Sequence, residues 1–336
     1  LSGSRTHPAS VCTTCPVPFG LPPPPLEILS LPSAAIMEMP RPATPPVELF
    51  SSTTPPAPAQ AAALALRMPA LAGSGLEPPR FHETGWHVGQ TFRARDDPDR
   101  TQEHWEPPRF VCERDPQLQH PELDPEELAV PNAAPARRFA RVVRGVLREQ
   151  DCAELITRVN AKGFTPALLN VGVDKQELRP HVRDGHRVIV DSKELADWLL
   201  RVLMPHLPET LDDGSQLVEL NERLRFLCYT PGQSFDEHLD GNYRRPHGHP
   251  RQGDLSRITV QLYLHNVPEA FGGATTFFPG RASSVKHQPE AGSVLLFTQD
   301  LPHEGSVVTE GIKYTLRTKV MYARPRPNET AKPKQG

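Results

Sequence analysis

The feature that most constrains the fold is a series of short runs, rich in β-branched and aromatic residues, that begins near Leu220. Turns containing glycine separate these runs, a pattern that is typical of strands. The expected strands are Arg223–Tyr229, Arg257–His265, Ala274–Phe278, Ser293–Phe297 and Lys313–Tyr322. Short strands at this spacing predict a sandwich or barrel, and we expect an antiparallel double-sheet jelly roll, also called a double-stranded β-helix.

Helical patterns precede the strands. One helix is expected from Arg137, with its apolar residues on a single stripe. That stripe would consist of Phe139, Val142, Val143, Val146 and Leu147. A second helix is expected from an N-cap at Asp151 to Gly163. A third begins at Ser192 and ends at Pro205. Helices followed by strands indicate an α+β fold, mainly β, with the helices buttressing one face of the jelly roll.

Proline is concentrated at the start of the chain, where residues 1–80 hold 18 of the 40 prolines. We expect a disordered proline-rich tail there, which either stays solvated or binds an adaptor domain that recognises polyproline II segments. Residues 81–134 show no sustained periodicity and are expected to form an irregular arm. The folded domain is expected at 135–322, with its core at 220–322, and is followed by a C-terminal tail at 323–336.

Charge and hydropathy argue against several classes of protein. With 37 Lys and Arg against 40 Asp and Glu, no overall positive field favours a nucleic-acid partner. The sequence contains no run of about eighteen apolar residues, so no membrane span is predicted. Five cysteines, mostly far apart, do not resemble a secreted disulfide framework. We therefore expect a cytoplasmic or nuclear protein rather than one of the endoplasmic reticulum, whose retention signal the ending KPKQG at 332–336 also lacks.

A histidine and acid pair with a later histidine suggests a metal site. His238 and Asp240 stand two positions apart at the end of a short predicted strand, so both side chains can point to one face. A neighbouring strand can bring His303 to the same place. Two imidazoles and one carboxylate suit Fe(II) and leave coordination positions open. Because the chain has 14 histidines, the pair His238 and Asp240 alone is weak evidence for a metal site. The other residues at fixed spacing from the pair decide whether a metal site is predicted.

The last predicted strand carries a cation toward this site. Lys313, Thr315 and Arg317 share one face of it, and the apolar positions between them share the other. A cation held inside a barrel beside a metal requires an anion. Three roles stay open for Arg317: it steadies a bound carboxylate, contacts the substrate, or pairs with an acid of the protein.

Four ordered motifs carry a resemblance to a known family. They read YTPGQSFDEHLD at 229–240, GGATTF at 272–277, GSVLLF at 292–297 and HEG at 303–305, followed by Lys313. In this order and at this spacing they resemble the catalytic domain of the prolyl 4-hydroxylase family of Fe(II)/2-oxoglutarate dioxygenases. The resemblance covers residues 220–322, and it extends only loosely over the preceding helices.

The resemblance implies the cofactors and several residue roles. His238, Asp240 and His303 would be the iron ligands, and Lys313 would pair with the distal carboxylate of the cosubstrate 2-oxoglutarate. The family oxidises 2-oxoglutarate to succinate and CO2 while it hydroxylates a substrate, with ascorbate as the expected reductant.

Two tyrosines and one phenylalanine complete the implied site. Tyr229 and Tyr263 resemble the family tyrosines that hydrogen-bond the cosubstrate, and each also fits a core aromatic residue whose hydroxyl finds a backbone partner. Arg317 would face the same interior. Phe235 stands where the family often has tyrosine, so one hydrogen bond near the site is lost.

The substrate follows less directly. The expected substrate is a prolyl or other residue of a protein or peptide; the same chemistry on a small molecule or a nucleic-acid base, or an inactive jelly-roll binding module, stays open. The basic loop at 243–251 follows the proposed iron ligands and is expected to form a lid. Its charge would favour an acidic substrate, unless the loop is simply solvated.

Overall fold

The structure is a computed structural model, and it describes residues 77–94, 105–116, 123, 125–130, 138–280 and 283–324. Most of the expected proline-rich tail and most of the expected C-terminal tail lie outside the described residues. The described residues all fall in one compact unit. Among them, no helix is long and apolar enough to cross a membrane.

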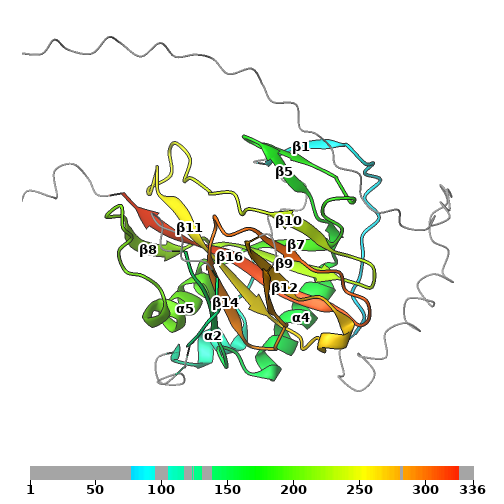
Figure 1. Ribbon diagram of the computed structural model, residues 1–336, viewed down its shortest axis with the longest axis horizontal. Coiled ribbons are helices and arrows are strands. Elements are labelled where there is room, and N and C mark those ends of the chain that lie inside the picture. Colours follow the sequence, from blue (N-terminus) through cyan, green and yellow to red (C-terminus); the bar gives the residue numbers. More distant parts are fainter. Residues whose placement is uncertain are drawn as a thin grey trace, which may run out of the picture. The chain divides into compact units, whose positions relative to one another are not determined.

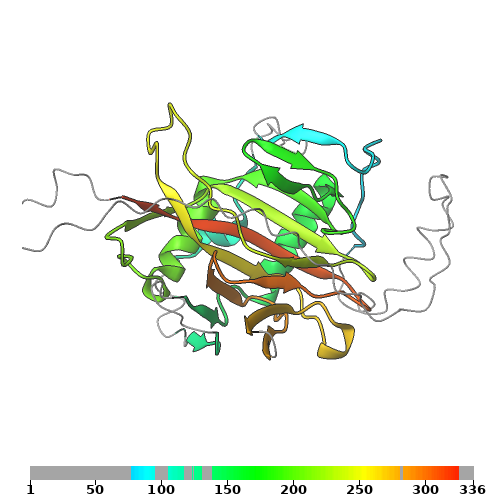
Figure 2. The same cartoon turned by 45° about the horizontal axis from the view of Figure 1, so that its top comes forward.

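Antiparallel strands form three sheets within the described residues (Figures 1 and 2). The large sheet has the order β2 (Pro125–Glu127), β3 (Ala140–Val143), β14 (Val294–Thr298), β11 (Leu255–Tyr263), β16 (Lys313–Ala323), β9 (Arg223–Tyr229), β7 (His186–Asp191) and β4 (Thr165–Pro166), with β8 (Gln216–Leu220) paired to β16. The smaller sheet is β10 (Phe235–His238), β15 (His303–Gly305), β12 (Thr275–Gly280) and β13 (Ser283–His287). A third sheet is formed by β1 (Thr91–Arg93), β6 (Lys175–Glu177) and β5 (Leu169–Gly172). The large and smaller sheets form the predicted jelly roll.

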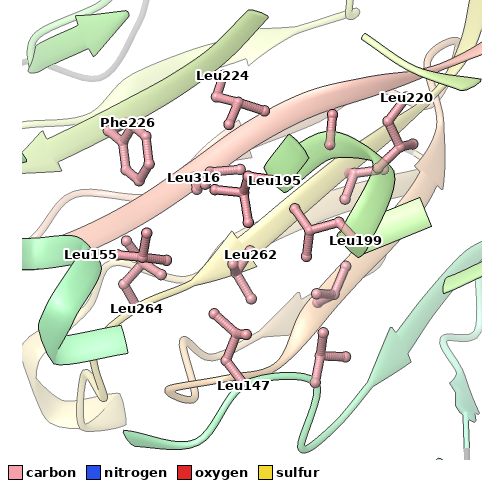
Figure 3. Packing of buried hydrophobic residues seen from close by; sticks show 14 of the residues in the cluster. Leu147, Leu155, Leu195, Leu199, Leu220, Leu224, Phe226, Leu262, Leu264 and Leu316 are labelled. Atoms are coloured by element: carbon pink, nitrogen blue, oxygen red, sulfur yellow. The ribbon is translucent and has the colours of Figure 1, made fainter. Parts of the chain in front are cut away.

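Helices α4 (Glu149–Lys162) and α5 (Lys193–Leu203) lie together on one side of the large sheet (Figures 1 and 2). Figure 3 shows Leu195 and Leu199 of α5 directed at Leu316 and Leu262 of the strands, and all four side chains are fully buried. Burial of this apolar face is what holds the helices against the sheet. The predicted α+β arrangement, with helices on one face, is confirmed.

The boundaries of α5 follow the sequence closely. The hydroxyl of Ser192 accepts a hydrogen bond from the backbone N–H of Leu195 at 3.3 Å, as an N-cap does. Pro205 lies in the short 3-10 turn Met204–His206 that follows the helix. The predicted start and end of this helix are both confirmed.

One predicted helix and one predicted N-cap were wrong. The stretch expected to form a helix from Arg137 contains strand β3, which pairs with β14 and β2. Its short apolar run fits a buried strand as well as a helix, and Gly145, with a φ of 71°, ends it. Asp151 does not cap α4 but lies inside its first turn, where its carboxylate accepts from the backbone N–H of Arg148 at 3.1 Å. The predicted end at Gly163 is confirmed.

The expected arm at 81–134 contains regular elements where it is described. Besides β1 and β2 it holds the short helix α2 (Arg109–Glu113). Phe110 of this helix is buried, with its ring 5.1 Å from that of Trp198 in an edge-on contact. This part of the arm therefore contributes to the core.

Strand β16 separates the core from the site. Tyr314, Leu316 and Val320 pack into the cluster shared with the helices. The alternate residues, Lys313 and Arg317 among them, face the interior of the jelly roll, where Lys313 stands opposite Tyr229 of β9. A second apolar cluster, which includes Tyr263, Phe277 and Phe297, fills part of the space between the two sheets of the roll.

Candidate functional site

The structure brings together the three residues expected to bind a metal. His238 ends β10 and His303 begins β15, and the two residues stand directly opposite each other in this antiparallel pair. Asp240 follows β10, and its backbone N–H donates to the carbonyl oxygen of Gln299 at 3.0 Å. One ligand atom from each side chain lies within 4.8 Å of the others. The three form a compact donor set on the smaller sheet.

Backbone carbonyls orient both imidazoles. Nδ1 of His238 lies 2.7 Å from the carbonyl oxygen of Asp236, and Nδ1 of His303 lies 2.9 Å from that of Leu301. A proton on each Nδ1 satisfies these carbonyls and leaves the Nε2 lone pairs toward Asp240, whose Oδ1 is 3.7 Å and 4.0 Å away. Nε2 of His238 is buried without a hydrogen-bond partner among the described residues. A buried acceptor of this kind fits a metal ion.

The carboxylate of Asp240 is buried and held by two neighbours. The hydroxyl of Thr259 donates to Oδ2 at 2.5 Å, and the guanidinium of Arg317 donates to Oδ1. Burial alone would raise the pKa of Asp240, but Arg317 and the two histidines hold it well below its ordinary value. Burial lowers the pKa of His303 to about 4. At neutral pH the site thus offers an ionised carboxylate and a neutral imidazole, the forms that bind metals.

Arg317 therefore takes one of its three expected roles. It pairs with an acid of the protein, and that acid is Asp240. Its side chain also lines the cavity beside the two histidines.

Lys313 is a buried cation without a carboxylate partner among the described residues. Its side chain is 3% exposed, and its Nζ lies 5.7 Å from the ring centroid of Tyr229 and 6.0 Å from that of Tyr263. Burial lowers the pKa of Lys313 to about 7. An anion that entered this position would restore the charged state, so the lysine is suited to receive one.

The two tyrosines differ in their contacts. The hydroxyl of Tyr263 donates to the hydroxyl of Thr275 at 2.8 Å and accepts from the amide of Gln261 at 3.0 Å, so it has side-chain partners in place of the backbone partner considered above. Tyr229 lines the cavity, and its ring covers Gly185, where an added Cβ would lie 2.6 Å from the ring. Of the two tyrosines, Tyr229 is the one whose side chain lines the cavity.

A narrow cavity joins these groups. Its walls are Leu227, Tyr229, Phe235, His238, Gln261, Thr275, His303, Glu304, Gly305, Lys313, Thr315 and Arg317. Sequence reasoning missed Gln261 and Thr275. Strand alternation offered a signal for Gln261, because it stands between Thr259 and Tyr263 on the same face of β11. Thr275 lies in the GGATTF motif, but whether its side chain reaches the cavity depends on how the smaller sheet folds over the larger one.

Phe235 forms one wall of the site by stacking. Its ring centroid lies 3.6 Å from that of His238, with the planes 21° apart. The guanidinium carbon of Arg183 lies over the same phenyl ring, 4.7 Å from its centroid. Where the family often has a phenol, this chain has a ring that contacts an imidazole and a guanidinium.

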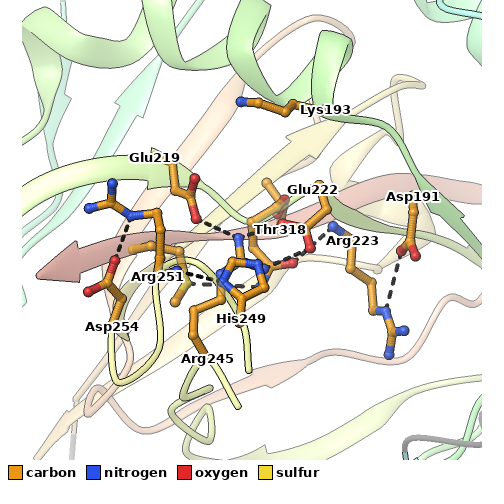
Figure 4. A network of polar contacts seen from close by, with 12 residues as sticks. Asp191, Lys193, Glu219, Glu222, Arg223, Arg245, His249, Arg251, Asp254 and Thr318 are labelled. Atoms are coloured by element: carbon orange, nitrogen blue, oxygen red, sulfur yellow. Dashed lines mark hydrogen bonds and ion pairs between the residues drawn. The ribbon is translucent and has the colours of Figure 1, made fainter. Parts of the chain in front are cut away.

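Two of the three arginines in the basic loop at 243–251 are paired with acids of the protein. The side chain of Arg245 is buried and forms ion pairs with Glu219 at 2.6 Å and Glu222 at 2.5 Å (Figure 4). Arg251 pairs with Asp254 at 2.6 Å. Acids of the protein itself therefore neutralise these two arginines.

Comparison with known proteins agrees with this geometry. Residues 224–320 match the family model of the 2OG-Fe(II) oxygenase superfamily, and the match contains the three grouped residues and Lys313. No curated protein matches the chain. The resemblance to Fe(II)/2-oxoglutarate dioxygenases that the motifs predict is confirmed over these residues.

Several solved structures are similar to part of the chain. The viral collagen prolyl hydroxylase from Paramecium Bursaria Chlorella virus-1, solved with 2-oxoglutarate, is 20% identical over 55% of this chain and 96% of its own, with a TM-score of 0.37. A prolyl-4-hydroxylase from Pseudomonas putida is 19% identical over 54% and 91%, with a TM-score of 0.38. A prolyl hydroxylase from Trichoplax adhaerens, in complex with a hypoxia inducible factor peptide fragment, is 17% identical over 54% and 82%, with a TM-score of 0.43.

Proposed function

We propose that this chain, which matches the 2OG-Fe(II) oxygenase superfamily over residues 224–320, hydroxylates a prolyl or other residue of a protein or peptide. The enzyme is an Fe(II)- and 2-oxoglutarate-dependent dioxygenase. In the proposed reaction one oxygen atom of O2 enters the substrate as a hydroxyl group and the other enters succinate, as 2-oxoglutarate loses CO2. The Trichoplax adhaerens neighbour was solved in complex with a peptide fragment.

His238, Asp240 and His303 are the proposed iron ligands. The observation that carries this assignment is the buried Nε2 of His238, which has no hydrogen-bond partner among the described residues and lies 3.7 Å from the Asp240 carboxylate. Two imidazoles and a carboxylate suit Fe(II) and leave positions for other ligands. Bound Fe(II), with 2-oxoglutarate and dioxygen, supplies the oxidising power for the C–H bond, and ascorbate is the proposed reductant that keeps the iron reduced.

Lys313 and Arg317 of β16 have different proposed roles. We assign Lys313 to the distal carboxylate of 2-oxoglutarate, because its buried ammonium lacks a carboxylate partner in the described part of the chain. Tyr229, whose ring lies beside the ammonium, lines the same cavity and is a second candidate contact. Arg317 acts on Asp240 and is a positioning residue: it holds the carboxylate ionised and in place.

Apolar side chains cover part of the proposed site. Phe235 covers His238, and Leu227 forms part of the same wall. Excluding water strengthens the electrostatic contacts of Lys313 and limits side reactions.

The experiment is succinate formation from 2-oxoglutarate by purified protein with Fe(II) and ascorbate. His303→Ala should abolish it with the fold retained, whereas Lys313→Ala should mainly raise the concentration of 2-oxoglutarate required. Unchanged turnover in His303→Ala would contradict the ligand assignment. A mass gain of one oxygen on peptides supports the proposed substrate class, and the same gain on metabolites or bases instead would replace it.

A further inference from the structure

Arg183 lies beside the proposed metal site on a segment that extends the smaller sheet. The segment pairs with β10: Asp236 donates its backbone N–H to the carbonyl of Val182 at 2.9 Å, and Asp184 donates to that of Ser234 at 2.9 Å. Phe235 stacks on His238, and the guanidinium of Arg183 lies over the same phenyl ring. One aromatic ring therefore links Arg183 to a proposed iron ligand.

The guanidinium is fixed at one end and unsatisfied at the other. Nη1 donates to the carbonyl of Leu168 at 3.0 Å. Nε and Nη2 are buried and have no hydrogen-bond partner among the described residues. Arg183 as a whole is 7% exposed. The N–H bonds of Nε and Nη2 point in the same direction from one edge of the planar group. This edge is the one that binds both oxygens of a carboxylate.

Among the described residues, no carboxylate hydrogen-bonds to this edge of Arg183. Arg187 and Arg317 act on it with the same sign of charge. Of the groups that favour its charged form, Tyr229 acts most and the Asp240 carboxylate acts less. Asp240 is already held by Thr259 and Arg317. Burial lowers the pKa of Arg183 to about 10, so the group stays charged at neutral pH. A buried, charged donor pair without an acceptor is destabilising unless a ligand completes it.

We propose that the Nε and Nη2 edge of Arg183 binds a carboxylate of the substrate, so that the enzyme selects substrates that carry this group near the hydroxylated carbon. This inference rests on the proposed function. The carboxylates of 2-oxoglutarate are accounted for at the metal and at Lys313, which lies on the large sheet, whereas Arg183 lies along the outer edge of the smaller one. Since the edge is closed to solvent, the carboxylate reaches it as neighbouring side chains such as Phe235 shift.

The selectivity for acidic substrates that the loop at 243–251 suggested thus has a different origin. Two arginines of that loop are neutralised by acids of the protein, whereas the Nε and Nη2 edge of Arg183 is buried without a hydrogen-bond partner among the described residues. An acidic side chain and a free C-terminus both provide the required group, and the experiment below separates them.

Binding of a small carboxylate tests the proposal without any turnover. The full chain is loaded with Zn(II) and N-oxalylglycine, an unreactive analogue of 2-oxoglutarate, and titrated with 4-fluorobenzoate by 19F NMR. The uncharged 4-fluorobenzamide serves as the ligand control. Arg144→Gln is the protein control, because Arg144 is a solvent-facing arginine paired with Glu126 and Glu290.

We expect the wild type and Arg144→Gln to bind the benzoate and not the benzamide, and Arg183→Gln to bind the benzoate at least tenfold more weakly. Arg183→Lys, which keeps the charge and loses the paired donors, should give an intermediate affinity and serves if Arg183→Gln does not fold. Displacement by N-acetylglycine supports a terminal carboxylate, and displacement by the α-amide of N-acetylglutamate supports an acidic side chain.

Equal benzoate binding in wild type and Arg183→Gln, equal binding of the benzamide, displacement by neither competitor, or no benzoate binding in the wild type would each overturn the proposal. Zn(II) and N-oxalylglycine binding is measured separately. Their failure to bind counts against the proposed function, while the benzoate titration still decides the role of Arg183.

Discussion

Two buried arginines of this protein have opposite surroundings. Arg245, 3% exposed, meets Glu219 and Glu222 through both terminal nitrogens, and the pairs attach the loop at 243–251 to the large sheet beside β8 (Figure 4). Arg183, 7% exposed, meets a backbone carbonyl at one nitrogen and leaves two others without partners among the described residues. The guanidinium of Arg245 stabilises a loop. In our proposal, the guanidinium of Arg183 obtains its missing hydrogen-bond acceptors from a ligand.

The difference teaches how burial should be interpreted for a charged side chain. Removing one partner of a buried ion pair leaves an uncompensated charge, which is strongly destabilising. Removing a buried charge that has no partner relieves a cost that is already present. Replacing arginine by an apolar residue is therefore expected to change the free energy of unfolding in opposite directions at the two positions.

The largest effect on activity is expected from a substitution in the proposed metal site, which lies next to Arg183. Asp240→Ala should abolish succinate formation and reduce bound iron to background, because two imidazoles remain and Arg317 loses its acid partner. Iron content by metal analysis and turnover of 2-oxoglutarate measure this. Wild-type iron content in the variant would remove Asp240 from the ligand set.

Breaking the paired arginine is the next largest effect. Arg245→Met should lower the free energy of unfolding by about 2 kcal/mol. This loss is smaller than that for a fully buried ion pair, because the side chain of Glu222 is partly exposed. Urea unfolding measures the change. Addition of Glu222→Gln to this variant should recover part of the loss, since one of the two acids then no longer needs a cation. A double variant that is less stable still would contradict the pairing argument.

Removing the unpaired arginine should have a smaller effect of opposite sign. Arg183→Leu should raise the free energy of unfolding of the ligand-free protein by about 1 kcal/mol, because an unsatisfied buried charge is replaced by an apolar group. The same urea experiment measures it, and the stabilisation should disappear in the presence of 4-fluorobenzoate, which stabilises the wild type alone. A destabilised variant would indicate that Arg183 has a structural role.

Buried histidines extend the comparison to groups that stay neutral. Burial lowers the pKa of His287 to about 4, below the ordinary value of 6.5. Because the folded pKa is the lower one, stability is fully present above pH 6.5 and is lost as the pH falls toward 4. Between pH 7.5 and 5.5 the loss should be about 1 kcal/mol, and His287→Gln should show a correspondingly smaller pH dependence of its urea midpoint. An identical pH dependence in the variant would contradict the assignment.

The sequence predicted the strands and the grouped residues well because their signals are local. The five expected strands all occur within two or three residues of the expected bounds, and the spacing of His238 and Asp240 follows from how a strand ends. β3 was mistaken for a helix because a short apolar run fits both periods. Its pairing with β14 decided the outcome, and that contact joins segments far apart in the chain.

Arg183 could not have been identified from its neighbours in the sequence. It stands well before the motifs, in a segment whose pairing with β10 is a tertiary contact. Whether an arginine is paired depends on which acids the fold places within reach, and the loop arginines had seemed the better candidates by composition. The partners of a buried charge are a property of the packed molecule, unlike the alternation of a strand.

The cross-strand position of His238 and His303 has a mechanical consequence. A metal ion held by both would act as a reversible cross-link between β10 and β15, two segments that are distant in the chain. Such a cross-link closes the long loop between His238 and His303 and so lowers the entropy of the unfolded chain. The cross-link is lost when the ion leaves. Chelation would then loosen the smaller sheet before the helices detach, so amide exchange in β10 and β15 should report the state of the metal while α5 stays protected.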